Sequence, residues 1–118
     1  MASPLRNLVI LAGVIAAFIV LSGCTAINAG YTGYSGDNFT ISLENAGAPS
    51  EAYVQVTAYQ LSGLSQEEYL VVSRPVSLVT GPNRIEIPAK LPAGNYKLYT
   101  YVIQNGERKT AVIRDIGV

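Results

Sequence analysis

The residue with the most distinctive chemistry in this sequence is its single cysteine, Cys24, in the segment VLSGCTA at residues 20–26. Oxidising compartments favour paired cysteines and a lone buried cysteine is usually inert packing, so the role of Cys24 needs an explanation. One cysteine excludes an internal disulfide, and the absence of histidine further excludes a zinc site of Cys and His ligands.

The other polar residues form no recognisable catalytic set. Without histidine, a serine nucleophile would need a lysine base, but Lys90, Lys97 and Lys109 fall on a predicted turn, on an exposed strand position and near a hairpin. Glu67 and Glu68 are adjacent, and neighbouring carboxylates in a loop diverge. We therefore expect a protein that is not an enzyme and that holds no metal and no cofactor.

The residues before Cys24 form an apolar segment. Residues 8–21, LVILAGVIAAFIVL, contain no polar side chain, and Arg6 is the one charge ahead of them. As a helix this segment would be about 21 Å long, shorter than the roughly 30 Å hydrocarbon core of a bilayer. An apolar core of this length is typical of a signal peptide.

The four residues Leu21, Ser22, Gly23 and Cys24 resemble the lipobox of bacterial and archaeal lipoproteins, which is an aliphatic residue, a small residue, Gly or Ala, and then Cys. This resemblance implies that a diacyl or diether lipid alkylates Cys24 and that residues 1–23 are removed as the signal peptide. Two hydrocarbon chains hold a protein firmly on a membrane, whereas a single chain gives only marginal membrane binding. The rest of the protein would then be anchored outside the cytoplasm, at the cell surface or in the periplasm.

Two other interpretations of the apolar segment stay open. A helix over residues 8–27 would be about 30 Å long, enough to span a bilayer without being cleaved. Alternatively, the segment is a buried helix of a soluble protein in which Cys24 packs as a small apolar residue.

Residues 28–37, NAGYTGYSGD, are rich in Gly and Tyr and show no apolar periodicity. This composition predicts a flexible tether over residues 24–37, with a reach of about 20 Å. Tyr31 and Tyr34 would lie at the level of the lipid headgroups or in solvent.

After the tether, apolar and polar residues alternate, which predicts strands with one buried face. The pattern over residues 38–118 therefore predicts an all-β fold, namely a single Ig-like antiparallel sandwich of about seven strands. The N-terminal apolar helix precedes this sandwich. One helical turn is expected at residues 65–68, where Ser65 and Glu68 fit a capping box. The predicted strands cover residues 39–43, 54–58, 69–73, 76–78, 85–87, 96–104 and 110–116. At Arg74-Pro75 the chain either bends or lies at a sheet edge, because proline offers no ladder donor.

Residues 91–98, LPAGNYKL, resemble the corner before the sixth strand of immunoglobulin-like and fibronectin-type-III-like sandwiches, where a Tyr hydroxyl bonds to the backbone upstream. The resemblance implies that Tyr96 takes that role here. Leu98 stands where antibody domains have a Cys, and the chain has no Trp, so an antibody-type domain is excluded. Together with ENAGAPSEA at residues 44–52, the pattern over residues 38–118 resembles the CARDB-like domains of prokaryotic surface proteins, a resemblance that implies a fold and no particular activity.

The Asn105-Gly106 turn predicts a hairpin and, with it, the faces of the last two strands. If Gln104 pairs with Glu107 in a regular ladder, Leu98 lies opposite Ile113. One face must be core, and the predicted core residues are Tyr96, Leu98, Thr100, Val102, Ala111 and Ile113. The other face would expose an apolar stripe, which is either a contact surface or ordinary cross-strand packing. This candidate interaction surface consists of Tyr99, Tyr101, Ile103 and Val112.

The charges are balanced, with 8 basic and 8 acidic residues, so no field is available to attract nucleic acid. Asn38 begins the sequon Asn38-Phe39-Thr40 and is the candidate glycosylation site, which we expect to be unmodified.

These features predict a membrane-anchored, extracytoplasmic, non-catalytic accessory or binding module of the cell envelope. Its expected partners are membrane lipid and another envelope protein or a surface polymer, and a homo-oligomer is left open. The alternative is a structural subunit of a surface filament or membrane complex that keeps its N-terminal helix, as pilin-like proteins do. Such pilins carry a basic processing site ahead of the apolar run, where this chain has Arg6 alone.

Overall fold

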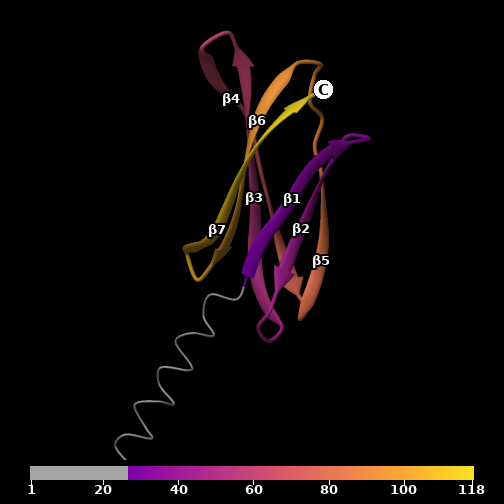
Figure 1. Cartoon of the computed structure of the whole chain (residues 1–118), viewed down its shortest axis with the longest axis vertical. Helices are drawn as coiled ribbons and strands as arrows, with labels where there is room; N and C mark the ends of the chain where they lie inside the picture. The colour runs from indigo at the N-terminus through magenta and orange to yellow at the C-terminus, as the bar shows by residue number, and fades with distance from the viewer. Residues whose placement is uncertain (1–26) are drawn as a thin grey trace, which may run out of the picture.

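The computed structural model describes residues 27–118, which form seven strands in two antiparallel sheets packed face to face (Figure 1). The smaller sheet has the order β1-β2-β5 and the larger sheet the order β4-β3-β6-β7. The predicted all-β, Ig-like sandwich is confirmed. The strands are β1 (Ile27–Ser35), β2 (Asn38–Asn45), β3 (Ser50–Ser62), β4 (Ser65–Leu78), β5 (Gly81–Pro88), β6 (Asn95–Gln104) and β7 (Glu107–Gly117).

The predicted apolar helix and the lipobox residues Leu21, Ser22, Gly23 and Cys24 lie outside the described residues. Within residues 27–118, no helix has the length and apolar character that crossing a bilayer requires.

The core lies between the sheets, and it is filled by the alternating residues that the sequence pattern predicts. Phe39 and Ile41 of β2 meet Val54 and Val56 of β3, and all four are fully buried. Each such side chain contributes about 1.5–3 kcal/mol through its burial. Tyr96, Leu98, Thr100 and Val102 of β6 are also fully buried, as predicted.

The expected flexible tether is wrong for residues 27–35, because these residues form β1. This strand pairs with β2 along its whole length, from Ile27 opposite Asn45 to Ser35 opposite Asn38. The register shifts between Ala29 and Tyr31, so a bulge interrupts the period-two pattern. The inward residue after the bulge is a threonine, Thr32, and not an apolar residue, which is why no alternation was visible in the sequence.

Strand β4 is one continuous strand, although two strands separated by Arg74-Pro75 were predicted. It lies at the edge of the larger sheet, where proline is tolerated because one side of the strand needs no ladder donor. Seven strands were predicted and seven are present, but the two sets differ. Strand β1 was not predicted, and two of the predicted strands form the single strand β4. The helical turn predicted at residues 65–68 is also wrong: Ser65 begins β4, and its hydroxyl donates to the Ser62 carbonyl at 2.8 Å across a two-residue turn.

The predicted tyrosine corner is present. The Tyr96 hydroxyl donates to the Pro92 carbonyl at 2.7 Å. Beside it, Gly94 and Val118 exchange two backbone hydrogen bonds of 2.9 and 2.8 Å, which tie the end of β7 to the corner. Burial raises the pKa of the Tyr96 hydroxyl, with smaller contributions from Tyr69 and Tyr34.

Candidate functional site

The candidate surface depends on the pairing of β6 with β7, which differs from the predicted regular ladder. Gln104 pairs with Glu107 as expected, but the next pairs are Ile103 with Arg108 and Val102 with Thr110. Lys109 is therefore the extra residue of a β-bulge. A bulge of one residue moves every later side chain of β7 to the opposite face.

Two of the predicted core positions and one predicted surface position are wrong as a result. Ala111 and Ile113 lie on the outer face, where the Ile113 side chain is 59% exposed. Val112 pairs with Thr100 and belongs to the inner face. Tyr99, Tyr101 and Ile103 lie on the outer face as predicted. An Asn-Gly turn sets only the pair beside it, so the sequence could not reveal the bulge.

The outer face of the larger sheet, which we name the tyrosine face, consists of four rows of side chains that cross β4, β3, β6 and β7. Members of a row are direct cross-strand neighbours, so their side chains lie close together. In the order β4, β3, β6, β7, the rows are: Pro75, Tyr53, Ile103, Arg108; Ser73, Gln55, Tyr101, Ala111; Val71, Thr57, Tyr99, Ile113; Glu68, Tyr59, Lys97, Asp115.

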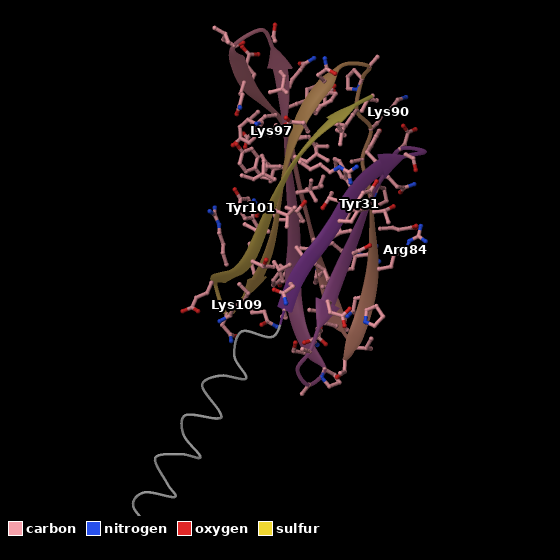
Figure 2. All side chains as sticks on the ribbon, viewed as in Figure 1. Tyr31, Arg84, Lys90, Lys97, Tyr101 and Lys109 are labelled. Carbon is pink, nitrogen blue, oxygen red and sulfur yellow. The ribbon has the colours of Figure 1, made fainter. Side chains whose placement is uncertain are left out.

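Aromatic rings form a continuous stripe on this face. The rings of Tyr59 and Tyr99 meet edge to face at 5.2 Å between centroids, and Tyr99 stacks beside Tyr101 at 6.4 Å. The Arg108 guanidinium lies 4.1 Å from the centroid of the Tyr101 ring. In Figure 2, Tyr101 and Lys97 lie on the side of the molecule opposite Arg84 of the smaller sheet. Aromatic and cation–π pairs of this kind each contribute about 0.5–1.5 kcal/mol.

Aliphatic and aromatic side chains flank the stripe and face solvent. Tyr53 is 55% exposed and Val71 is 46% exposed, and Ile113 lies at the opposite edge of the face. Apolar residues gathered in one patch mark an interaction site more often than isolated ones do. The tyrosine face is therefore rich in tyrosine, one of the residues that contribute most to protein contacts.

The charges of the tyrosine face balance one another. Lys97 and Arg108 are basic, Glu68 and Asp115 are acidic, and the net charge of the four rows is zero. The Lys97 ammonium lies 3.5 Å from the Asp115 carboxylate. The face therefore offers no surplus charge to a strongly charged ligand.

A shallow hollow of about 220 Å³ adjoins the first row. The Gln104 amide at its rim is held in place, because it donates to the Ser50 hydroxyl and to the Glu51 carbonyl, both at 3.0 Å. The hollow is smaller than the roughly 300 Å³ at which small-molecule sites begin, so it extends the tyrosine face and is not an independent pocket. Its lining residues are Glu51, Ala52, Tyr53, Pro75, Ile103, Gln104 and Asn105.

The other polar candidates are engaged in local contacts. Lys109 lies 3.1 Å from Glu107, and Lys97 is paired with Asp115. The Asn38 side chain donates to the Gly36 carbonyl at 2.9 Å. The Tyr34 hydroxyl donates to the Ala89 carbonyl at 3.0 Å, so this side chain is held against the sandwich. In the part of the chain that the structure describes, no three Cys, His, Asp or Glu side chains are grouped to hold a metal ion.

Of the sixteen residues of the tyrosine face, the sequence predicted only Tyr99, Tyr101 and Ile103. Tyr53, Tyr59, Val71, Arg108 and Ile113 belong to it but were not predicted. For β3 a signal existed, because Tyr53 and Tyr59 occupy the outward positions of an alternating strand. For Ile113 none existed, since its face depends on the bulge.

Comparisons with known proteins support the fold. No protein-family model matches the sequence, and no curated protein is similar to it. Among solved structures, the chain is similar to part of the crystal structure of a "putative beta-galactosidase from bacteroides fragilis", with a TM-score of 0.56 and 18% sequence identity. The match covers 80% of this chain and 16% of that chain. The chain thus resembles one small portion of a much larger protein, and the likeness is one of fold.

Proposed function

We propose that this protein is a lipid-anchored, non-catalytic binding module outside the cytoplasm, which holds its partner on the tyrosine face. The observation that carries the binding role is the exposure of Tyr53, Val71 and Ile113 around the ring stripe of one sheet. The anchor rests on the sequence, where Leu21, Ser22, Gly23 and Cys24 follow an apolar segment.

The position of β1 bears directly on how such an anchor would act. Because β1 begins at Ile27, only Thr25 and Ala26 lie between it and Cys24, so three Cα-to-Cα steps connect the two. Three extended residues reach at most about 11 Å. A lipid on Cys24 would therefore hold the sandwich against the membrane surface, closer than the roughly 20 Å reach of a flexible tether.

Mass spectrometry of the chain purified from its native membrane tests the anchor. We expect a mature species that begins at Cys24 and carries the mass of two hydrocarbon chains. An unmodified chain that keeps its apolar segment would overturn the anchor and favour the filament subunit.

Photo-crosslinking in intact cells tests the contact surface. A photoreactive residue at Ile113 is expected to capture one defined partner, and Val71→Glu on the same face is expected to abolish the capture. Val79 serves as the matched control, because it is 57% exposed and lies outside the tyrosine face. Capture at Val79 equal to that at Ile113, or capture that survives Val71→Glu, would show that the tyrosine face is not the contact.

A further inference from the structure

We propose that the occupant of the tyrosine face is a second copy of this chain, bound about a twofold axis that runs parallel to the strands. The inference rests on the proposed function, since it concerns the same face. It follows from the cross-strand order of the side chains, which makes the face complementary to itself.

A twofold axis along the strands places each row against the same row of the second copy, read in reverse. Strand β4 then faces β7 of the second copy, and β3 faces β6. The axis leaves the height along the strands unchanged, so the row partners can be taken directly from the pairing of the four strands.

This arrangement brings like with like at the apolar positions. Val71 lies opposite Ile113 of the second copy, so two exposed aliphatic side chains cover each other. In the first row, Tyr53 lies opposite Ile103 in the same way. In the second row, the Gln55 amide lies opposite Tyr101, whose hydroxyl is a suitable hydrogen-bond partner for an amide. Each of these contacts occurs twice, as an isologous interface requires.

The charges permit this pairing. The net charge of the tyrosine face is zero. Two copies of this face therefore do not repel each other, whereas two faces that carried the same net charge would. Arg108 lies opposite Pro75. The one unfavourable pair sets Glu68 against Asp115 in the outermost row, where Lys97 of the second copy lies beside them and solvent screens the repulsion.

The size of the face matches a weak specific dimer. Four strands at about 4.8 Å spacing and a length of about 30 Å give about 600 Å² per copy, or about 1,200 Å² in total. That total is the lower end of the range for specific interfaces. Two copies anchored in one membrane would be held at a high effective concentration, which favours a contact of this strength.

The direction of the axis also allows both copies to be anchored in the same membrane surface. In each copy, β1 begins at the end of the sandwich away from the C-terminus (Figure 1). An axis along the strands leaves the first residue of β1, Ile27, at the same end of the dimer in both copies. An axis across the strands would place the two Ile27 residues at opposite ends, so both chains could not enter the same membrane surface.

Disulfide trapping of the full chain in its membrane tests the pairing. Val71 and Ile113 of one chain are separated by three strand spacings, about 14 Å, too far for a disulfide within the chain. We expect a covalent dimer when Val71→Cys and Ile113→Cys are combined in one chain, and when the two single variants are co-expressed. Either variant alone and the control pair Val79→Cys with Ile113→Cys should stay monomeric. Dimers of the same yield from a single variant, or none from the pair, would overturn the proposed axis.

Charge substitution provides a second test that requires no oxidation. Val71→Lys or Ile113→Glu alone is expected to lower the dimer association constant at least about tenfold, because each places a charge against an apolar side chain. The double variant should regain dimerisation, since the introduced ammonium of one copy would then face the introduced carboxylate of the other. The measurement is light scattering of the detergent-solubilised full chain. If every variant is monomeric while capture of a different protein at Ile113 still depends on Val71, the proposed function stands and the dimer fails; if neither assay responds, both fail.

Discussion

At the scale of single residues, a buried pair of threonine hydroxyls joins the two sheets. Thr32 of β1 and Thr100 of β6 share a hydrogen bond of 2.8 Å, and Thr32 is only 1% exposed. One hydroxyl donates this bond and the other accepts it, so neither buried oxygen is left without a partner. A buried polar group that loses its partner is costly, whereas the removal of both partners is nearly neutral.

Thr32→Val is therefore expected to lower the free energy of unfolding by about 1–3 kcal/mol, and so is Thr100→Val, because each leaves one hydroxyl unpaired. The double variant should be less destabilised than the sum of the two single variants. Chemical denaturation of the three variants measures this coupling. Additive effects would show that the two hydroxyls do not depend on each other.

Tyr96 is the second residue whose role can be measured. Its hydroxyl donates to the Pro92 carbonyl, and burial raises its pKa above the ordinary value of a tyrosine. Because the folded pKa is the higher one, the stability that Tyr96 contributes is complete below the unfolded pKa of about 10 and is lost as the pH rises toward the folded pKa.

Tyr96→Phe is expected to lower the free energy of unfolding by about 1 kcal/mol at neutral pH through loss of one hydrogen bond. Above a pH of about 10, the free energy of unfolding of the variant should also fall less steeply with pH than that of the original chain. Denaturation curves from neutral to strongly alkaline pH measure both effects. Tyr99→Phe on the outer face serves as the control, and an alkaline decrease that is identical in Tyr96→Phe and the original chain would contradict the assignment.

At the scale of elements, register shifts in three strand pairs, β1–β2, β3–β4 and β6–β7, decide which residues reach the surface. The bulge in β1 allows the strand to bury Thr32 and to present Tyr31 outward, where the Arg114 guanidinium lies 4.0 Å from the ring centroid. Arg114 also donates to the Thr32 carbonyl at 3.2 Å, so β7 of one sheet holds β1 of the other. The bulge in β7 turns Ile113 outward and completes the tyrosine face.

Deletion of Lys109 tests the bulge in β7. Removal of the extra residue leaves the pairs Ile103 with Arg108 and Val102 with Thr110 in place, so we expect the fold to persist with a change in stability of about 1 kcal/mol or less. Deletion of Val112 moves part of β7 to the wrong face and should cost several times more. Thermal unfolding of the two deletion variants gives the comparison. Equal losses from both deletions would mean that Lys109 is not the extra residue.

At the scale of the whole molecule, the sandwich has two distinct ends. Ile27 lies at the end that also holds the β6–β7 turn with Asn105, because Ile27 pairs with Asn45 and Gln104 bonds to Ser50 (Figure 1). The β3–β4 turn with the fully exposed Leu64 lies at the far end. The length of β3 separates the ends by about 40 Å.

If Cys24 carries the proposed lipid, the end with Asn105 lies near the membrane and Leu64 lies far from it. A fluorophore at Asn105→Cys is then expected to be quenched by nitroxide-labelled lipids, and one at Leu64→Cys is not. Fluorescence of the full chain in vesicles measures the difference. Equal quenching at both positions would contradict the close attachment that β1 implies.

The sequence was informative wherever the role of a side chain depends on the residues next to it in the chain. Alternation located β2, β3, β5 and β6, and the residues around Tyr96 predicted its hydrogen bond to the backbone upstream. The sequence failed at β1, where polar and glycine residues fill a strand. At Arg74-Pro75 the edge position that it allowed is correct, but the division into two strands is wrong, because an edge strand tolerates a proline. The sequence also failed for Ala111, Val112 and Ile113, although their residue types were correctly assigned to a strand.

The sequence by itself determined the all-β class and the identity of most core residues, because local alternation specifies these, and a short motif is the basis of the anchor proposed at Cys24. Tertiary structure alone decided that residues 27–35 form a strand and which residues make up the tyrosine face. The physical reason is that β1 is stabilised by contacts with β2, Thr100 and Arg114, which are distant in the chain. The register of β7 likewise depends on one bulged residue, whose effect on every later side chain emerges only when the strand is paired with β6.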